Sequence, residues 1–136
     1  MQAASDQLVL IDDDADILAA VRLILEPVGF RIAASMTGPE GLALVRRLRP
    51  AAVLLDVMLS TPTEGFELAG IIRSTPDLAD TRIVMISAID AAAGAEYAQR
   101  MGSAFDPGDA FLTKPLRADV LRDTVKRVLK TAEPTP

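Results

Sequence analysis

The chain has 136 residues, the length of one domain, and its 50% hydrophobic and 24% charged residues are typical of a globular protein. It contains no cysteine and no histidine, which excludes disulfides, a thiolate metal site and catalysis by an imidazole base. Its 14 basic and 19 acidic residues give a net charge of −5, which argues against nonspecific DNA binding by this domain.

Neither a membrane span nor a secretory signal is evident. No apolar run approaches the roughly 20 residues that cross a bilayer, and the start MQAASDQ lacks a basic region and an apolar core. We therefore expect a cytoplasmic protein without a membrane partner. We also expect an N-terminal extension over residues 1–6, one folded domain over 7–130, and a flexible C-terminal tail or linker stub over 131–136.

Short apolar runs, which suit strands buried on both faces, alternate with stretches of helical spacing. Strand 8–11 precedes a helix with the apolar stripe Ile17, Val21, Ile24 and Leu25, which ends at Pro27 and Gly29. Strand 30–34 precedes a helix capped by Thr37, with Pro39 in its first turn and the stripe Leu42, Val45 and Leu48. Strands 51–55, 83–86 and 110–113 precede helices at about 64–74, 91–101 and 117–130.

This strict alternation of strand and helix predicts the fold class. Consecutive parallel strands need right-handed crossover connections, and the crossover helices cover the sheet. We therefore predict an α/β fold with a doubly wound, five-stranded parallel sheet and helices on both faces.

Polar residues follow four of the five predicted strands, at the edge of the sheet where open parallel sheets bind ligands. They are Asp12, Asp13 and Asp14 after the first strand, Asp56 after the third, Ser87 after the fourth, and Lys114 with Pro115 after the fifth. Taken one at a time, such residues are common as helix caps, turn residues or surface charges. Their agreement in position is what predicts a shared site.

The carboxylates of this site would repel one another. Two of them about 4 Å apart repel by roughly 4 kcal/mol at an effective dielectric constant near 20, so the cluster calls for a cation. Carboxylate oxygens suit Mg²⁺ or Mn²⁺, whereas Zn²⁺ prefers the histidine or cysteine ligands that the chain lacks. The sequence therefore predicts Mg²⁺ as the cofactor, with Mn²⁺ as a substitute.

The segments LVLIDDD, AVLLDVML, IVMISA and FLTKPL resemble, in this order and spacing, the receiver domains of bacterial two-component response regulators. The resemblance covers about residues 7–130 and implies a flavodoxin-like sheet with the strand order 2-1-3-4-5. It implies that Asp12, Asp13, Asp56 and the backbone carbonyl of Met58 bind Mg²⁺. It also implies that Asp56 is the nucleophile that takes a phosphoryl group from the phosphohistidine of a histidine kinase.

The resemblance gives roles to the remaining strand-end residues. Ser87 and Lys114 would bind phosphoryl oxygens, and the Lys114–Pro115 peptide bond would be cis. Phe111 would rotate inward on activation, with Ser87 as the second switch residue. Such a protein is a phospho-accepting signalling domain and not a turnover enzyme.

The same resemblance implies two kinds of partner protein. The donor would be a histidine kinase or a histidine phosphotransfer protein. The recipient of the signal would be a downstream protein effector or an output domain outside this sequence, and a homodimer is left open.

Three features depart from the family pattern. The loop after Asp56 is one residue longer than usual, with Ser60 where proline is common. Residues 104–109 form an insertion before the last strand, on a face that receivers use for output or dimerisation. Met58 and Ile89 are apolar where receivers that lose phosphate quickly tend to be polar, so we expect slow self-dephosphorylation.

Two other functions fit part of the pattern. A haloacid-dehalogenase-like phosphatase would use Asp12 and Asp14 as nucleophile and acid, but it would leave Asp56 without a role. That family also needs a downstream acidic pair at a strand end, and only the helical Asp119 and Asp123 follow Lys114. A receiver-like binding module that is never phosphorylated is the third alternative.

Overall fold

The computed structural model describes residues 6–62, 64–88, 96 and 108–132. Its strands are β1 Gln7–Ile11, β2 Arg31–Ser35, β3 Ala52–Asp56, β4 Arg82–Ser87 and β5 Ala110–Thr113. Its α-helices are α1 Ala15–Leu25, α2 Gly38–Leu48, α3 Glu64–Ser74 and α5 Ala118–Ala132, with short 3₁₀ helices at Glu26–Val28 and Pro76–Leu78. The helix predicted at 91–101 and most of the insertion at 104–109 lie outside the described residues.

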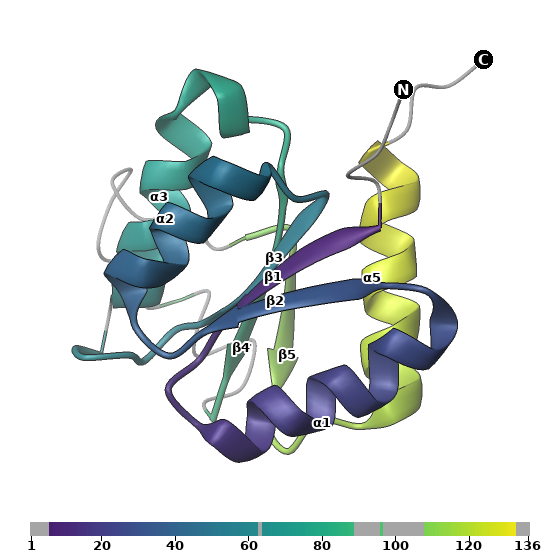
Figure 1. Ribbon diagram of the computed structural model, residues 1–136. Coiled ribbons are helices and arrows are strands. Elements are labelled where there is room, and N and C mark those ends of the chain that lie inside the picture. The colour runs from purple at the N-terminus through teal and green to yellow at the C-terminus, as the bar shows by residue number, and fades with distance from the viewer. Residues whose placement is uncertain (1–5, 63, 89–95, 97–107, 133–136) are drawn as a thin grey trace.

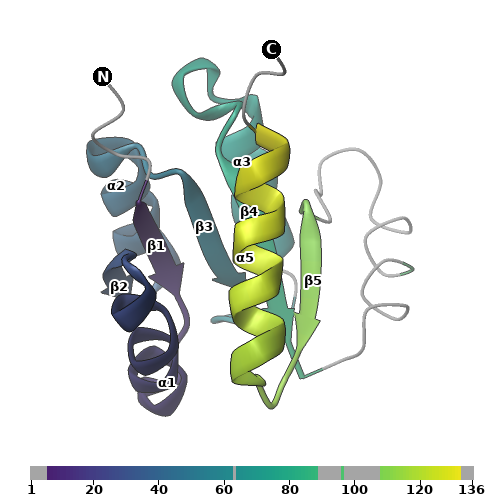
Figure 2. The ribbon, with the colours of Figure 1, turned by 90° about the vertical axis from the view of Figure 1, so that its right-hand side faces the viewer.

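The five strands form one parallel sheet in the order β2-β1-β3-β4-β5, as predicted (Figure 1). Helices α1 and α5 cover one face of this sheet, and α2 and α3 cover the other (Figure 2). The chain therefore has the doubly wound α/β fold that the alternation of strands and helices predicts.

Each face of the sheet has its own apolar core, because neighbouring side chains along a strand point to opposite faces. Val9, Val53 and Leu55 pack under α2 and α3, whereas Leu8, Leu10 and Leu54 pack under α1 and α5. The helix stripes join these cores as predicted, with Val21, Leu25 and Val45 fully buried. Helix α3 contributes the buried side chains of Phe66, Ala69 and Ile72.

Helix ends follow the local sequence. Thr37 caps α2 and accepts a hydrogen bond from the Glu40 N–H, while Asp14 caps α1 and accepts one from the Asp16 N–H. Gly29 ends the turn after α1 in a left-handed conformation with φ of 104°, which glycine adopts without a steric penalty.

Strand boundaries differ by one residue from the predicted ones at several places. β2 and β3 each start and end one residue later than predicted, and β4 is extended by one residue at both ends. The apolar runs mark where side chains are buried, whereas a strand ends where its backbone hydrogen bonds end. Because of this shift, Asp56 and Ser87 are the last residues of their strands and are held by the sheet itself.

Candidate functional site

The carboxyl ends of four neighbouring strands bring the predicted site residues together. In the sheet register Ile11 pairs with Leu55, Asp56 pairs with Ile86, and Ser87 pairs with Thr113. Asp12 follows β1 and Lys114 follows β5, each by one residue. The site is thus built on rigid strand ends, which fixes its geometry more tightly than a loop would.

Lys114 lies between two buried carboxylates. Its Nζ is 3.1 Å from Asp12 Oδ2 and 3.4 Å from Asp56 Oδ2. Asp12 is fully buried and Asp56 is 4% exposed, so solvent screens these charges little. One ammonium group therefore faces two carboxylates that are themselves shielded from water.

The carboxylate of Asp12 is incompletely satisfied. Its Oδ1 accepts a hydrogen bond from the Asp14 N–H at 2.9 Å. Its Oδ2 has the ion-pair contact with Lys114, but it accepts no well-aligned hydrogen bond from the residues that the structure describes. A buried carboxylate oxygen in this state is a natural ligand for a further cation.

Burial raises the pKa of Asp56 to about 6, and the negative charge of Asp12 acts in the same direction. The ammonium of Lys114 and the Met58 N–H, which donates to Asp56 Oδ1 at 3.2 Å, oppose this shift without cancelling it. Burial alone would lower the pKa of Lys114, but its contacts with Asp12 and Asp56 outweigh that effect and raise it. The site carries an excess of negative charge that one lysine does not neutralise.

Asp12, Asp13 and Asp56 can hold a metal ion together, because each offers a carboxylate oxygen and these oxygens all lie within 4.8 Å of one another. Asp13 is exposed and the other two are buried, so the cluster opens to solvent on one side. An all-oxygen ligand set that leaves room for water fits Mg²⁺ or Mn²⁺. The third aspartate of the run, Asp14, caps α1 and is not in this cluster.

The loop after β3 is anchored to the start of α3. The Gly65 N–H donates to the Val57 carbonyl at 2.8 Å. A Cβ at Gly65 would overlap the Asp56 carbonyl oxygen and the Val57 backbone, so only glycine allows α3 to lie this close. Met58, whose carbonyl is the predicted metal ligand, follows directly, and its side chain is 42% exposed.

Ser87 and Phe111 lie on adjacent strands. Ser87 is fully buried at the end of β4, and its carbonyl accepts a hydrogen bond from the Lys114 N–H at 2.7 Å. Phe111 is half-buried and packs against the core under α2 and α3. The Lys114–Pro115 peptide bond is cis, as the resemblance implies.

Two supporting residues were not among the predicted site residues. The carbonyl of Ser35, the last residue of β2, accepts a hydrogen bond from the Asp12 N–H at 3.1 Å and so fixes the backbone of the acidic pair. Gly65 makes the close contact described above. The sequence did contain a signal for Ser35: it is a polar residue directly after the apolar run of β2, at the carboxyl edge where the predicted site residues lie.

Comparison with known proteins identifies the family. The model of the response regulator receiver domain matches residues 8–126. The chain belongs to this family.

The receiver domain is 35% identical over 130 residues to the transcriptional regulatory protein AfsQ1 of Streptomyces coelicolor, covering 93% of this chain and 52% of that protein. It is 28% identical over 128 residues to the response regulator MprA of Mycobacterium leprae, covering 94% and 53% respectively. The chain thus spans about half the length of the curated relatives it matches.

Solved structures support the same fold. A sensor protein from Polaromonas sp. JS666 matches this receiver domain with a TM-score of 0.80 and 25% identity, over 93% of this chain and 98% of that one. A CheY-like response regulator receiver domain protein from Methanospirillum hungatei matches with a TM-score of 0.77 and 24% identity, over 93% and 95%. Among the described residues, no helix is long and apolar enough to cross a bilayer.

Proposed function

We propose that this receiver domain accepts a phosphoryl group on Asp56 from the phosphohistidine of a histidine kinase or of a histidine phosphotransfer protein. Asp12, Asp13, Asp56 and the Met58 carbonyl hold Mg²⁺ for this reaction. The observation that carries the proposal is the cluster of three carboxylates at the carboxyl edge of the sheet, two of which face the ammonium group of Lys114.

Asp56 is suited to act as the nucleophile. One of its oxygens is held by the Met58 N–H and the other faces Lys114, so the carboxylate has a fixed direction. An oxygen of Asp56 bonds to phosphorus as the phosphorus–nitrogen bond of the phosphohistidine breaks, and the electron pair of that bond returns to the imidazole nitrogen. The product is an acyl phosphate on Asp56.

The excess negative charge of the site explains why a divalent cation is needed. Burial and the charge of Asp12 raise the pKa of Asp56 to about 6 although Lys114 opposes them, and an incoming phosphoryl group would meet repulsion. A divalent cation bound by the carboxylates would supply the charge neutralisation that phosphoryl transfer requires. The incompletely satisfied Oδ2 of buried Asp12 supports this assignment, because among the described residues its one cationic contact is the ion pair with Lys114.

Lys114 and Ser87 bind the transferred group. Lys114 already contacts Asp56, and its side chain is 20% exposed, so its ammonium can turn to a phosphoryl oxygen without leaving the site. Ser87 ends the neighbouring strand, and its hydroxyl supplies a second hydrogen bond. The acyl phosphate brings about one further negative charge to this edge.

That added charge is the signal. Ser87 moves toward the phosphoryl group and Phe111, on the adjacent strand, rotates inward, so the surface near β4 and β5 changes. The recipient is a downstream protein effector or an output domain. The names of the relatives, a transcriptional regulatory protein and a response regulator of about twice this length, are in keeping with an output domain in those proteins.

The test is to incubate the protein with Mg²⁺ and a small acyl-phosphate donor and to locate the modified residue by mass spectrometry. We expect one stable phosphoryl group on Asp56, lost in Asp56→Asn and absent when Mg²⁺ is chelated. Modification of Asp12, or repeated turnover of a phosphate ester, would instead support the phosphatase alternative. Absence of any modification in protein that still binds Mg²⁺ would support the non-phosphorylated binding module.

A further inference from the structure

The loop that carries the Met58 carbonyl has an unusual support. Ser60 stands where proline is common in receivers, and both of its donors go to one atom of α3. The Ser60 N–H lies 2.8 Å from Glu64 Oε1, and the Ser60 hydroxyl lies 2.6 Å from the same oxygen. Proline at this position would have neither donor.

The carboxylate of Glu64 lies close to the start of α2 on its other side. Its second oxygen lies against Gly38, the first residue of α2, where a Cβ would overlap it. Glu64 is also the first residue of α3, so it joins the start of α2, the start of α3 and the loop between β3 and α3. Without a side chain at position 38, the carboxylate can sit between the two helices and face Ser60.

Met58 lies between two fixed points of this loop. On one side the Val57 carbonyl accepts a hydrogen bond from the Gly65 N–H at 2.8 Å. On the other side Ser60 is bound by Glu64. With Val57 and Ser60 both attached to the first turn of α3, the direction of the Met58 carbonyl between them is restricted.

We propose that Glu64 is a positioning residue for the metal site: through Ser60 it orients the Met58 carbonyl toward the cation that Asp12, Asp13 and Asp56 hold. This inference rests on the proposed function, since Met58 is a ligand only if the cluster binds Mg²⁺. Glu64 does not touch the cation or the phosphoryl group. Its effect is to replace, by two hydrogen bonds, the stiffness that a proline would give this longer loop.

The experiment measures Mg²⁺ affinity directly, from the rise in melting temperature with Mg²⁺ concentration, because a ligand that binds only the folded state stabilises it by RT ln(1 + [L]/Kd). We expect Glu64→Ala to raise the apparent Kd for Mg²⁺ about fivefold, the factor that corresponds to the loss of one to two hydrogen bonds. Glu64→Gln retains an acceptor oxygen for Ser60 and should stay within about twofold of the unmodified protein. Ser60→Ala removes only the hydroxyl donor and should fall between the two.

Controls separate positioning from charge and from general stability. Asp77→Ala removes an exposed carboxylate that pairs with Arg49 at 3.2 Å. Asp77 lies in the 3₁₀ helix before β4, away from the carboxyl edge of the sheet, so the variant should leave the Mg²⁺ affinity unchanged. Ser60→Ala combined with Glu64→Ala should be no worse than Glu64→Ala alone, because both changes break the same contact.

Three results would overturn the inference while leaving the proposed function intact. They are an unchanged Mg²⁺ affinity in Glu64→Ala, a loss in Glu64→Gln as large as in Glu64→Ala, and additive effects of the Ser60 and Glu64 changes. Failure of the proposed function looks different, because the unmodified protein would then show no Mg²⁺-dependent phosphoryl group on Asp56. The rate of phosphorylation at saturating Mg²⁺ should be nearly equal in Glu64→Ala and the unmodified protein, since a positioning role is overcome by excess cation.

Discussion

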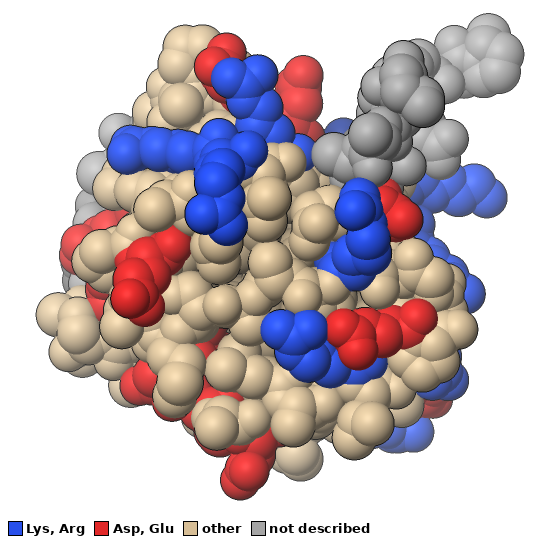
Figure 3. All heavy atoms as spheres, viewed as in Figure 1, with Lys and Arg blue, Asp and Glu red and all other residues tan. Residues whose placement is uncertain are grey.

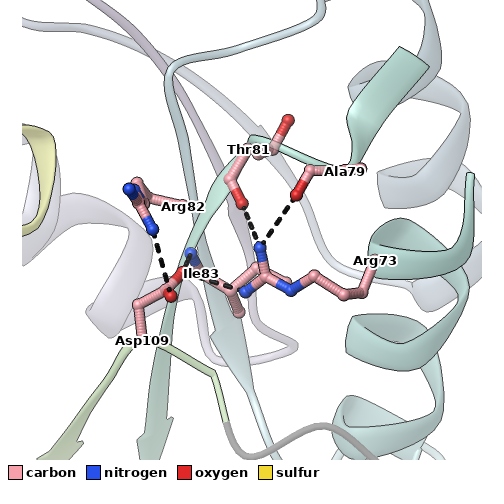
Figure 4. Close-up of polar contacts among 6 residues, drawn as sticks. All are labelled: Arg73, Ala79, Thr81, Arg82, Ile83 and Asp109. Carbon is pink, nitrogen blue, oxygen red and sulfur yellow. Dashed lines mark hydrogen bonds and ion pairs between the residues drawn. The ribbon is translucent and has the colours of Figure 1, made fainter. Parts of the chain in front are cut away.

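Carboxylates lie next to basic groups both at the edge where the strands begin and at the edge where they end. The two edges differ in how many basic groups each carboxylate contacts. At the amino edge, Asp109 accepts hydrogen bonds from Arg73 at 2.9 Å and from the Ile83 N–H at 2.8 Å, and it pairs with Arg82 at 3.5 Å (Figure 4). At the carboxyl edge, Asp12 and Asp56 share Lys114. Among the residues that the structure describes, one acid has two cations at the first edge, whereas two acids share one cation at the second.

The amino-edge cluster extends into the backbone. Arg73 also donates to the carbonyls of Thr81 and Ala79, at 2.9 and 3.2 Å, so it ties the end of α3 to the start of β4 (Figure 4). Asp109 immediately precedes β5, and its own N–H donates to the Ile83 carbonyl at 2.7 Å. The last residue of the predicted insertion thus anchors β5 onto β4, which is a structural role.

The surface charges are less sharply divided than these two clusters. On the face drawn in Figure 3, acidic side chains lie at the left and lower left, toward the carboxyl ends of the strands, whereas acidic and basic side chains lie together at the top and further basic ones lie on the right. A fully paired carboxylate stabilises the fold, while an underpaired one costs stability and is available for a ligand. The two edges should therefore respond in opposite directions when their acids are removed.

The largest expected effect is at the amino edge. Asp109→Ala leaves Arg73 and Arg82 without this carboxylate and removes the acceptor of the Ile83 N–H, so we expect the free energy of unfolding to fall by about 2–3 kcal/mol. Denaturant unfolding measures it, with Asp77→Ala as the control, since removing one partner of an exposed pair should change stability by less than about 0.5 kcal/mol. A loss of stability no larger than that of the control would contradict the structural role of Asp109.

At the carboxyl edge, Asp56→Asn should stabilise the metal-free protein at pH 7, by on the order of 2 kcal/mol. The pKa of Asp56 is raised from 3.8 to about 6 in the folded state, so its favourable contribution is complete below pH 3.8 and is lost as pH rises through 6. Asparagine does not titrate, so the advantage of the variant should be absent near pH 4 and grow up to pH 7.

This pH series is measured by chemical denaturation in the presence of a chelator. Subtracting the curve of the unmodified protein removes the titration of groups common to both proteins. The Asp56→Asn variant could instead be less stable than the unmodified protein at pH 7, or more stable by the same amount at pH 4 and pH 7. Either result would show that the charge of Asp56 is balanced by its neighbours, as that of Asp109 is.

Magnesium should reduce the stability advantage of Asp56→Asn and leave the loss in Asp109→Ala unchanged. At ten times its Kd, Mg²⁺ should stabilise the unmodified protein by about 1.4 kcal/mol, because it binds only the folded state. Asp109→Ala, although destabilised, should gain the same amount, whereas Asp56→Asn should gain much less. Calorimetric melting with and without Mg²⁺ tests this, and a reduced gain in Asp109→Ala would mean that the two edges are coupled.

The smallest expected effect concerns the lifetime of the phosphoryl group. Met58 is apolar and half-exposed beside the site, so it offers no hydrogen bond to an attacking water. Met58→Asn should shorten the half-life of phosphorylated Asp56 by a few fold, equivalent to about 1 kcal/mol in the barrier. Met58→Leu is the matched apolar control, and a half-life equally shortened in both variants would exclude this explanation. Ile89, the other apolar position, lies outside the described residues.

Much of the fold followed from the sequence because its signals are local. Continuous apolar runs between helical stripes predicted the parallel sheet and which helix faces are buried, and β5 and α3 match their predicted bounds. Strand ends were off by a residue because burial and backbone pairing do not stop at the same place. Helix α5 continues to Ala132, two residues beyond the predicted end of the folded domain, where the polar sequence gave no sign of it.

The candidate site was predictable for a different reason. In a parallel sheet all carboxyl ends lie at one edge, and residues that follow adjacent strands are neighbours whatever the loops do. That reasoning placed Asp12, Asp56, Ser87 and Lys114 together from their positions alone. It could not reveal the support from Ser35, Gly65 or Glu64, which depends on how loops and helices pack.

By itself, the sequence determined that several carboxylates and one lysine lie at the carboxyl edge, because parallel strands place all their carboxyl ends there. Only the tertiary structure decided which acids are satisfied. Asp56 and Asp109 both adjoin a strand and look alike in the sequence, yet one is buried with too little positive charge and the other accepts from two arginines and a backbone N–H. The physical reason is that the pairing of a charge depends on groups that are 26 to 58 residues away in the chain and meet only in the fold.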